Sequence, residues 1–295
     1  MKILLLGSNG MLGSDCNAVL SKEFEVIAPD KNELDIIRWD VVIEKMQEIA
    51  PDIVLNCAAF TDVDACETEH FTVRKINVEG PRNLAQGCAR FNCKLIHISS
   101  DYVFSGLKTI PQPYFEDDPM SPISAYGKSK MESEVAVREN VGNYIIIRSA
   151  WLYGHHGKNF ITSIVRQAMA DKKKPLSVVN DQYGSPTWTH RLALQIREFV
   201  KTDARGTYHA TSEGYCTRYE YACRILERLK IKRTVVPLSL KEITEGARRP
   251  SNCILENRLL KKLNIALMPE WEKDLDTYLE AYGKEYVKQA KAGKL

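Results

Sequence analysis

The chain has 295 residues, of which 44% are hydrophobic and 27% are charged, as is usual for a globular protein. Its 41 basic and 38 acidic residues give a net charge of +3, which is too near neutral to indicate a nucleic-acid or membrane partner. No apolar run reaches the roughly 18 residues that cross a bilayer, and the apolar N-terminal stretch is too short for a signal peptide.

Short apolar stretches alternate with helical patterns through the first half of the chain. Continuous apolar runs are typical of strands that are covered on both faces, and a 3.6-residue period predicts helices between them. The alternation predicts an α/β fold with a Rossmann-type doubly wound parallel sheet. The expected strands span 2–6, 24–28, 52–56, 94–99 and 143–148, and the expected helices span 11–22, 41–50, 69–91 and 126–140.

The pattern becomes less regular after residue 150. Helical periodicity continues over 157–170 and 217–229, with short strands over 176–179 and 206–210. We therefore expect residues 1–150 to form a dinucleotide-binding Rossmann domain and residues 151–295 to form mainly a smaller C-terminal α/β substrate-binding lobe. Later segments are expected to return to the first sheet. The lysine-rich C-terminal end is expected to be solvated.

The eight cysteines show no C-x-x-C spacing, and no histidine stands at ligand spacing from a cysteine. Several of them lie within apolar patterns, such as Cys57 in "IVLNCAAF". This distribution indicates buried, reduced thiols and a cytoplasmic location, and it predicts no metal site.

The first expected strand ends in "GSNGMLG", where Gly7, Gly10 and Gly13 are spaced G-x-x-G-x-x-G. One glycine permits a tight turn, one lets the backbone approach a pyrophosphate, and one lets the helix pack closely on the strand. The helix N-terminus then offers free N–H groups to phosphates. Because a strand precedes the loop and a helix follows it, the motif predicts a nicotinamide dinucleotide site.

The end of the second strand carries the residues that choose between the two nicotinamide cofactors. Asp30 is an acid that can bind the adenosine ribose, and Lys31 is a cation that can bind a 2′-phosphate. Asp35 and Ile36 follow where the adenine ring could rest. NADP(H) and NAD(H) both stay open, with NADP(H) slightly favoured.

Tyr126 and Lys130 stand four residues apart at the start of an expected helix and so share one face. An ammonium beside a phenol lowers the phenol's pKa, and a phenol tuned toward neutrality is a useful general acid. Ser100, with Ser99 as the alternative, ends the fourth strand and could orient a carbonyl oxygen. Together these side chains predict reduction of a carbonyl group by hydride.

The motifs "GSNGMLG", "NCAA", "SSDYVF" and "YGKSK" together resemble the extended short-chain dehydrogenase/reductase family. The blocks "RSAWLYG", "NDQYGSPT", "GTYHATSEG" and "RRPSNCILEN" resemble its reductases of nucleotide-linked 4-keto sugars, and the likeness extends beyond residue 250. The resemblance implies a sugar-nucleotide-binding lobe and reduction of the 4-keto group of dTDP-4-dehydro-L-rhamnose.

The resemblance also implies roles for individual residues. Tyr126 would protonate the C4 oxygen with Lys130 as its partner, and Ser100 stands where the family usually has threonine. Asn77 resembles the asparagine of a proton relay, although a structural role in the helix is an equal alternative. The substrate is expected to contact Ser100, Asp101, Tyr102, Tyr126, Trp151 and Arg249. The cofactor is expected to contact Gly7, Gly10, Met11, Leu12, Gly13, Asp30, Lys31, Asp35, Ile36, Cys57, Ala58, Ala59, Tyr126 and Lys130.

Two other functions remain open from the sequence. One is a nucleotide-sugar epimerase that retains NAD. The other is a non-catalytic regulatory subunit similar to the beta subunit of methionine adenosyltransferase. A homodimer is compatible with the resemblance, and no residue is assigned to an interface metal.

Overall fold

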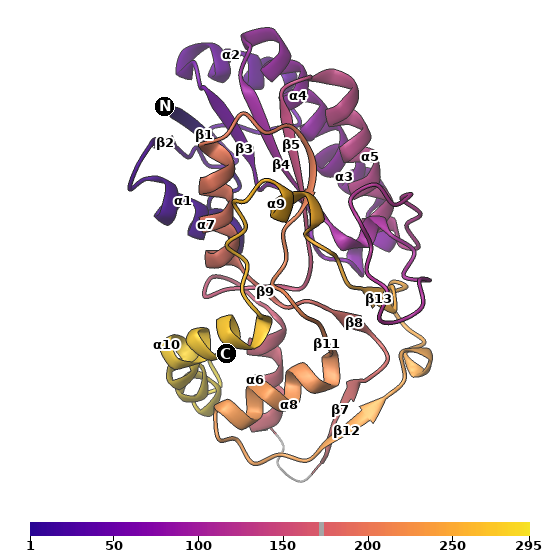
Figure 1. Ribbon diagram of the computed structural model, residues 1–295. Coiled ribbons are helices and arrows are strands. Elements are labelled where there is room, and N and C mark those ends of the chain that lie inside the picture. The colour runs from indigo at the N-terminus through magenta and orange to yellow at the C-terminus, as the bar shows by residue number, and fades with distance from the viewer. Residues whose placement is uncertain (171–173) are drawn as a thin grey trace.

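The computed structural model describes residues 1–170 and 174–295, and a six-stranded parallel sheet forms its larger part (Figure 1). The strand order is β10-β5-β4-β3-β1-β2, and every neighbouring pair is parallel. This confirms the predicted doubly wound α/β class. The strands are β1 (Lys2–Leu6), β2 (Glu25–Ile27), β3 (Ile53–Asn56), β4 (Lys94–Ser100), β5 (Tyr144–Ser149) and β10 (Gly206–His209).

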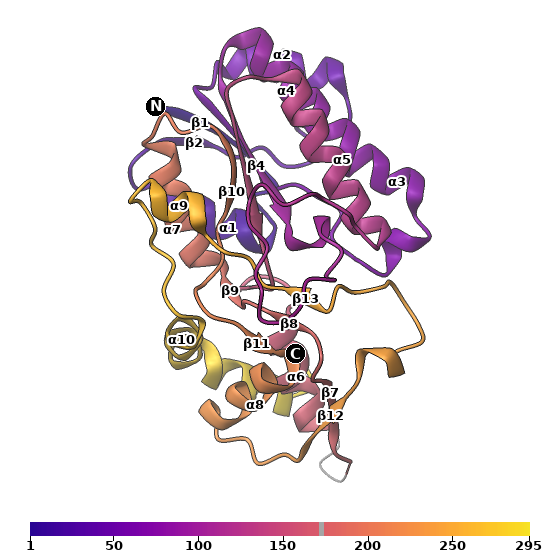
Figure 2. The ribbon, with the colours of Figure 1, turned by 45° about the vertical axis from the view of Figure 1, so that its right-hand side comes forward.

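Helices cover both faces of this sheet, which explains the continuous apolar strands. Ile3 and Leu5 belong to the core under α1 and α7, whereas Leu4 and Leu6 belong to the core under α2, α4 and α5. Figure 2 shows α4 and α5 on one side of the sheet and α7 on the other. The helices are α1 (Met11–Leu20), α2 (Trp39–Ile49), α4 (Gly80–Phe91), α5 (Ala125–Asn140) and α7 (Thr189–Val200).

The helix predicted over 69–91 is interrupted. It consists of α3 (His70–Arg74), a π-helical turn η2 (Lys75–Glu79) and α4. Pro81, near the start of α4, has no N–H to donate to the preceding turn. Single π turns are frequent at functional sites, and this one carries the buried Asn77.

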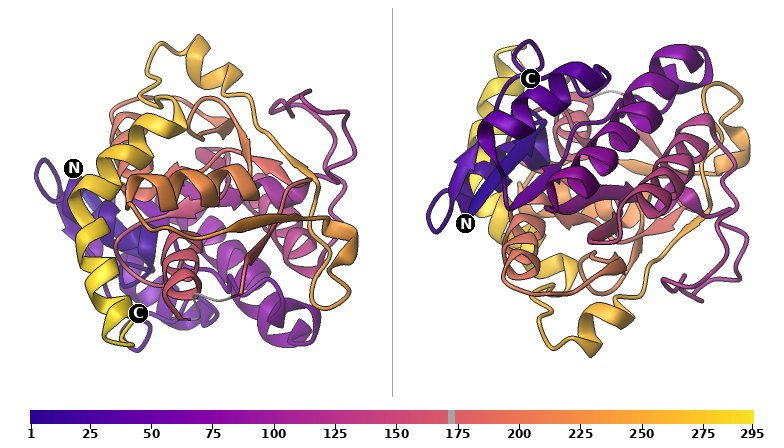
Figure 3. Two further views of the ribbon diagram at one scale, coloured as in Figure 1. Left: turned by 90° about the horizontal axis from the view of Figure 1, so that it is seen from below. Right: turned by 90° about the horizontal axis from the view of Figure 1, so that it is seen from above.

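The second half of the chain contributes both to the region of the six-stranded sheet and to a separate second lobe. The strand β10 extends the sheet beside β5, α7 packs on α1, and α9 (Arg258–Lys262) packs near β10. The other helices, α6 (Phe160–Ala170), α8 (Arg218–Arg228) and α10 (Trp271–Lys291), surround a separate core that includes Ile164, Tyr221 and Tyr278. The view from below in Figure 3 shows α8 beside α10.

Short strands form three small sheets that are separate from the six-stranded sheet. β6 pairs with β9, β7 with β12, and β8 lies between β11 and β13. Their bounds are β6 (Leu152–Tyr153), β7 (Leu176–Val179), β8 (Tyr183–Gly184), β9 (Thr187–Trp188), β11 (Cys216–Thr217), β12 (Val235–Leu238) and β13 (Asn252–Cys253).

The lysine-rich C-terminal end, expected to be solvated, is part of α10. Its lysines face outward, but Tyr278 and Tyr286 on the opposite face are buried against the second lobe. None of the helices within the described ranges is long and apolar enough to cross a bilayer.

Candidate active site

The glycine loop lies where β1 ends and α1 begins. Gly7 has a φ of +75°, and a Cβ on it would stand 2.7 Å from the backbone nitrogen of Ala58, which follows β3. A Cβ on Gly13 would stand 2.0 Å from the carbonyl oxygen of Gly7. The close turn and the close helix therefore both require glycine. The loop occupies the switch point between β1 and β3, where doubly wound folds bind ligands.

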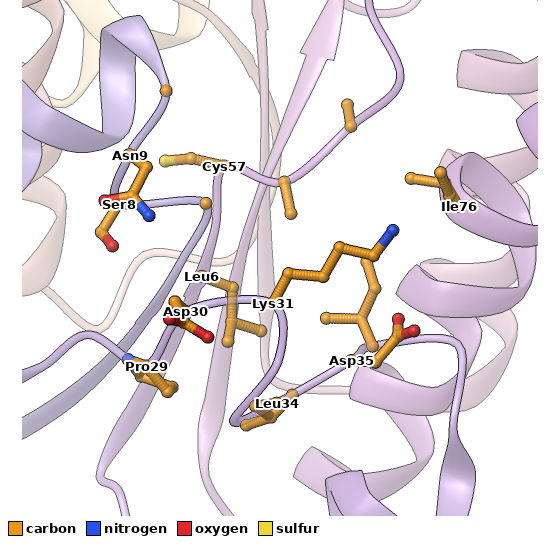
Figure 4. Close-up of a pocket in the computed structure, with 15 residues that line it drawn as sticks. Leu6, Ser8, Asn9, Pro29, Asp30, Lys31, Leu34, Asp35, Cys57 and Ile76 are labelled. Carbon is orange, nitrogen blue, oxygen red and sulfur yellow. The ribbon is translucent and has the colours of Figure 1, made fainter.

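A cavity of about 310 Å³, the glycine-loop cavity, opens beside this turn (Figure 4). It is bounded by the loop, by the end of β2 and by the start of the segment after β3. Of the residues predicted to bind cofactor, it is lined by Gly7, Gly10, Asp30, Lys31, Asp35, Ile36, Cys57, Ala58 and Ala59. Since a side chain on Gly7 could not be accommodated, the backbone itself forms one wall, as binding of a diphosphate requires.

Asp30 and Lys31 differ in the contacts that their side chains already make within the protein. The Asp30 carboxylate accepts hydrogen bonds from the backbone N–H groups of Asn32 at 2.7 Å and Glu33 at 3.1 Å. Lys31 forms no ion pair with the described residues, and Figure 4 shows its side chain extended across the cavity toward Ile76. One oxygen of the acid, Oδ1, is engaged by its own turn, whereas the whole ammonium of Lys31 faces the cavity.

A second cavity of about 420 Å³, the tyrosine cavity, adjoins the first, and Gly10, Cys57 and Ala59 line both. It contains the remaining predicted cofactor and catalytic residues. These are Met11, Leu12, Gly13, Ser100, Tyr126 and Lys130, and the predicted substrate residues Asp101, Tyr102 and Trp151 line it too. All of the predicted site residues except Arg249 therefore line these two adjoining cavities.

The start of α5 is fixed against the end of β4. The Ser124 hydroxyl caps α5 by accepting the N–H of Gly127 at 3.1 Å. A Cβ on Gly127 would stand 2.2 Å from the carbonyl oxygen of Tyr102, so glycine permits the close approach of the two segments. As a result the rings of Tyr102 and Tyr126 meet edge to face at 5.6 Å.

The ionisation of the tyrosine–lysine pair differs from the sequence-based expectation. Lys130 is buried, donates to the carbonyl oxygen of Ile98 at 2.7 Å, and has a pKa lowered by burial to about 8. Burial and the Asp101 carboxylate raise the pKa of the Tyr126 phenol, although contact with Ser100 opposes this. The predicted lowering of the Tyr126 pKa is therefore wrong for this structure, because desolvation is the largest effect and Lys130 is not among the groups that shift this pKa. The phenol is held in its acid form.

The two serines at the end of β4 have different partners. Ser99 donates to the buried carboxylate of Glu134 at 2.6 Å, and Glu134 is paired with Arg148. Ser100 donates to Asp101 at 2.7 Å and accepts the N–H of Tyr102 at 3.2 Å. Of the two hydroxyls, that of Ser100 lies with the Tyr126 group.

Asn77 and Arg249 are both engaged within the protein. The Asn77 amide donates to the carbonyl of Phe60 and the hydroxyl of Ser129, both at 3.0 Å, and accepts the N–H of Phe60 at 2.7 Å. It therefore ties η2 to the segment after β3 and to α5. Arg249 forms an ion pair with both oxygens of Asp64, at 3.0 and 2.8 Å, and lies outside the tyrosine cavity.

Arg218 is a residue of this site that the sequence did not reveal. It is the first residue of α8, lines the tyrosine cavity, and stacks on the Trp151 indole at 3.5 Å from the ring centroid. The sequence predicts only a helix over 217–229 and assigns no role to Arg218. The Thr217–Glu220 capping box marks the helix start, which is the available sequence signal that Arg218 stands at the N-terminal end of a helix.

The eight cysteines are free thiols, six of them buried, with Cys57 and Cys223 partly exposed. Within residues 1–170 and 174–295, no group of three or more His, Cys, Asp or Glu side chains is arranged to hold a metal ion.

Comparison with known proteins assigns the chain to a family. The model of the RmlD substrate binding domain family matches residues 1–284. The chain belongs to this family. Relatives of this chain include the spore coat polysaccharide biosynthesis protein SpsK of Bacillus subtilis (strain 168), which is 36% identical over 95% of this chain and 97% of its own length.

Solved structures of the RmlD family give the same result. A dTDP-4-dehydrorhamnose reductase from Clostridium acetobutylicum is 37% identical, with a TM-score of 0.92 over 96% of this chain and all of its own. A dTDP-4-dehydrorhamnose reductase from Bacillus anthracis in complex with NADP is 36% identical, with a TM-score of 0.90 over 95% of this chain and 99% of its own. These likenesses confirm the predicted family and the extended Rossmann-like fold.

Proposed function

We propose that this chain reduces the 4-keto group of a dTDP-linked 4-keto-6-deoxy sugar, with dTDP-4-dehydro-L-rhamnose as substrate and NADPH as reductant. The observation that carries the proposal is the junction of the two cavities. A phenol, an ammonium and a serine hydroxyl stand in the tyrosine cavity, directly beside the glycine-loop cavity that suits a dinucleotide. Relatives of the RmlD family that are named for this reduction, one of them solved with NADP, support it.

Ser100, Tyr126 and Lys130 have separate roles in carbonyl reduction. NADPH, when bound along the glycine-loop cavity, supplies the hydride. Ser100, whose O–H must turn from Asp101 to the substrate, orients the carbonyl oxygen by hydrogen bonding, and the Tyr126 phenol donates the proton that this oxygen requires. The Lys130 ammonium stabilises the negative charge that develops on the phenol oxygen. Because the pKa of Tyr126 is raised, the phenol is fully protonated at neutral pH, as a proton donor must be.

The test is oxidation of NADPH by the purified protein with dTDP-4-dehydro-L-rhamnose generated in place. We expect one NADPH consumed for each dTDP-L-rhamnose formed. Sugar interconversion with no net consumption of cofactor would instead indicate an epimerase. No turnover together with co-purification of a catalytic partner would indicate a regulatory subunit.

The lowered pKa of Lys130 predicts the pH dependence of the reaction. Below about pH 8 the Lys130 amine is charged, and as pH rises through about 8 it loses the charge that stabilises the developing phenolate. We therefore expect kcat/KM for reduction to fall above about pH 8. In Lys130→Arg, whose side chain keeps its charge in this range, the decline near pH 8 should be absent. A kcat/KM that stays level to pH 9.5 in the parent protein would contradict this assignment.

The free Lys31 ammonium predicts preference for NADPH over NADH. Lys31→Ala should raise the KM for NADPH roughly 10-fold, since a charged contact with the 2′-phosphate is lost, and should change the KM for NADH by less than about twofold. Lys22→Ala, on an exposed lysine near the end of α1, provides the control. Equal effects on both cofactors would show that Lys31 does not recognise the 2′-phosphate.

A further inference from the structure

Trp151 is held in an unusual conformation at the far wall of the tyrosine cavity. Its φ is +48°, in the left-handed region that bulky residues rarely adopt. A Cβ on Gly184 would stand 2.5 Å from the indole, so one face of the ring lies against the backbone of β8. The guanidinium of Arg218 covers the other face. The ring is thereby fixed between Gly184 and Arg218. A strained backbone conformation such as that of Trp151 is found mostly at functional sites.

Arg218 forms no direct ion pair within the described residues, although the Asp101 carboxylate of the same cavity attracts it from a longer distance. Its one hydrogen bond to another side chain is a long contact from Nε to the Gln182 amide oxygen at 3.5 Å. Other arginines of α8 are paired, such as Arg224 with Asp276 at 2.6 Å. A guanidinium has five N–H donors, and burial of such a cation without an anion is unfavourable. An anion from outside the protein would accept hydrogen bonds from these donors and compensate the positive charge.

The neighbours of Arg218 indicate which part of a ligand lies beside it. Asp101 is 3% exposed, and its Oδ2 has no hydrogen-bond partner; the Trp151 Nε1 is likewise buried without one. Both atoms are closed to a ligand in this structure. The Asp101 carboxylate lies beside Ser100 and Tyr126 and would repel an anion, so the uncharged sugar is expected on this side. The anionic part of the same ligand must therefore lie beyond them, at the guanidinium. Arg249, the arginine predicted to contact the substrate, is paired with Asp64.

We propose that Arg218 binds the diphosphate of a nucleoside-diphosphate sugar and so sets the depth to which the sugar enters the tyrosine cavity. The inference rests on the proposed function and extends it to a residue with no assigned role. Stacking on Trp151 fixes the plane of the guanidinium, which leaves its outer N–H groups directed at the diphosphate oxygens. Arg218 contacts the phosphate groups and not the base. Substitution of Arg218 should therefore weaken the binding of dTDP and of UDP by the same factor.

The test measures binding of dTDP, UDP and thymidine by titration calorimetry, without turnover. Arg218→Met keeps an apolar stem over Trp151 and should weaken dTDP and UDP binding roughly 10- to 100-fold, as loss of a charge-assisted pair does, while thymidine affinity changes less than about twofold. Arg218→Lys should weaken dTDP binding by an intermediate factor. Arg224→Met, on the paired arginine of the same helix, should bind dTDP like the parent protein.

Affinity for NADPH verifies that each variant is folded. If Arg218→Met loses NADPH affinity, the dTDP affinity of Arg218→Lys shows instead whether Arg218 binds the diphosphate. Arg218 variants that bind NADPH normally and dTDP within twofold of the parent would overturn the inference, as would a parent protein that binds no dTDP. Turnover of the keto sugar is measured separately. An active parent whose Arg218 variants keep dTDP affinity would thus refute the diphosphate site and leave the reductase function standing.

Discussion

Tyr126→Phe should lower kcat for reduction of the keto sugar by roughly 10²- to 10⁴-fold, which is the usual loss when a general acid is removed. The phenol lies in the tyrosine cavity with Ser100 and Asp101, and no other hydroxyl of α5 lines that cavity. Phenylalanine keeps the edge-to-face contact with Tyr102 and removes only the oxygen. The affinity for NADPH should therefore remain within a few-fold of the parent value.

Steady-state turnover and a direct binding titration separate these two effects. Tyr215→Phe, on a tyrosine that is 43% exposed, is the matched control and should retain full turnover. A Tyr126→Phe protein that turns over at the parent rate would exclude the phenol as the proton donor. A protein that loses NADPH affinity to the same extent as turnover would show that Tyr126 acts in cofactor binding instead.

Gly13→Ala should nearly abolish NADPH binding, with an affinity loss of about 100-fold or more. The new methyl group would stand 2.0 Å from the carbonyl oxygen and 2.7 Å from the carbonyl carbon of Gly7. Both are backbone atoms of the turn that would face the diphosphate, so the whole loop must move. The free energy of unfolding should also fall by about 2 kcal/mol, as overpacking of a close contact does.

Gly142→Ala is a strict control for this prediction. A Cβ at that position meets no atom within 4 Å, so unfolding and NADPH affinity should both remain near the parent values. Isothermal titration with NADPH and urea unfolding measure the two quantities. If Gly13→Ala binds NADPH like the parent protein, the loop is not the diphosphate site.

Features that depend on neighbouring residues were predictable from the sequence. The apolar stretches of β1, β3, β4 and β5 follow from burial on both faces, and the glycine loop follows from the turn it must make. The i, i+4 spacing of Tyr126 and Lys130 correctly places both of them in one cavity. These signals are local, so a single sequence carries them.

Features that depend on distant residues were not predictable. The stacking of Arg218 on Trp151 joins residues 67 positions apart, and no local pattern announces it. The raised pKa of Tyr126 follows from burial beside Asp101, and burial depends on the complete fold. The burial of Tyr286 likewise needs the core that α6 and α8 supply. The pairing of Arg249 with Asp64 was not predictable either, because the two residues come from opposite halves of the chain.

The most direct measurement of the central claim is transfer of deuterium from NADPH labelled at its reactive C4 position. The protein should place one deuterium per molecule on C4 of the sugar in dTDP-L-rhamnose, detectable by mass spectrometry and by loss of the C4 proton signal. Tyr126→Phe should yield the same labelled product at a greatly reduced rate. A product without deuterium, or deuterium at another carbon of the sugar, would contradict reduction at C4 by this site.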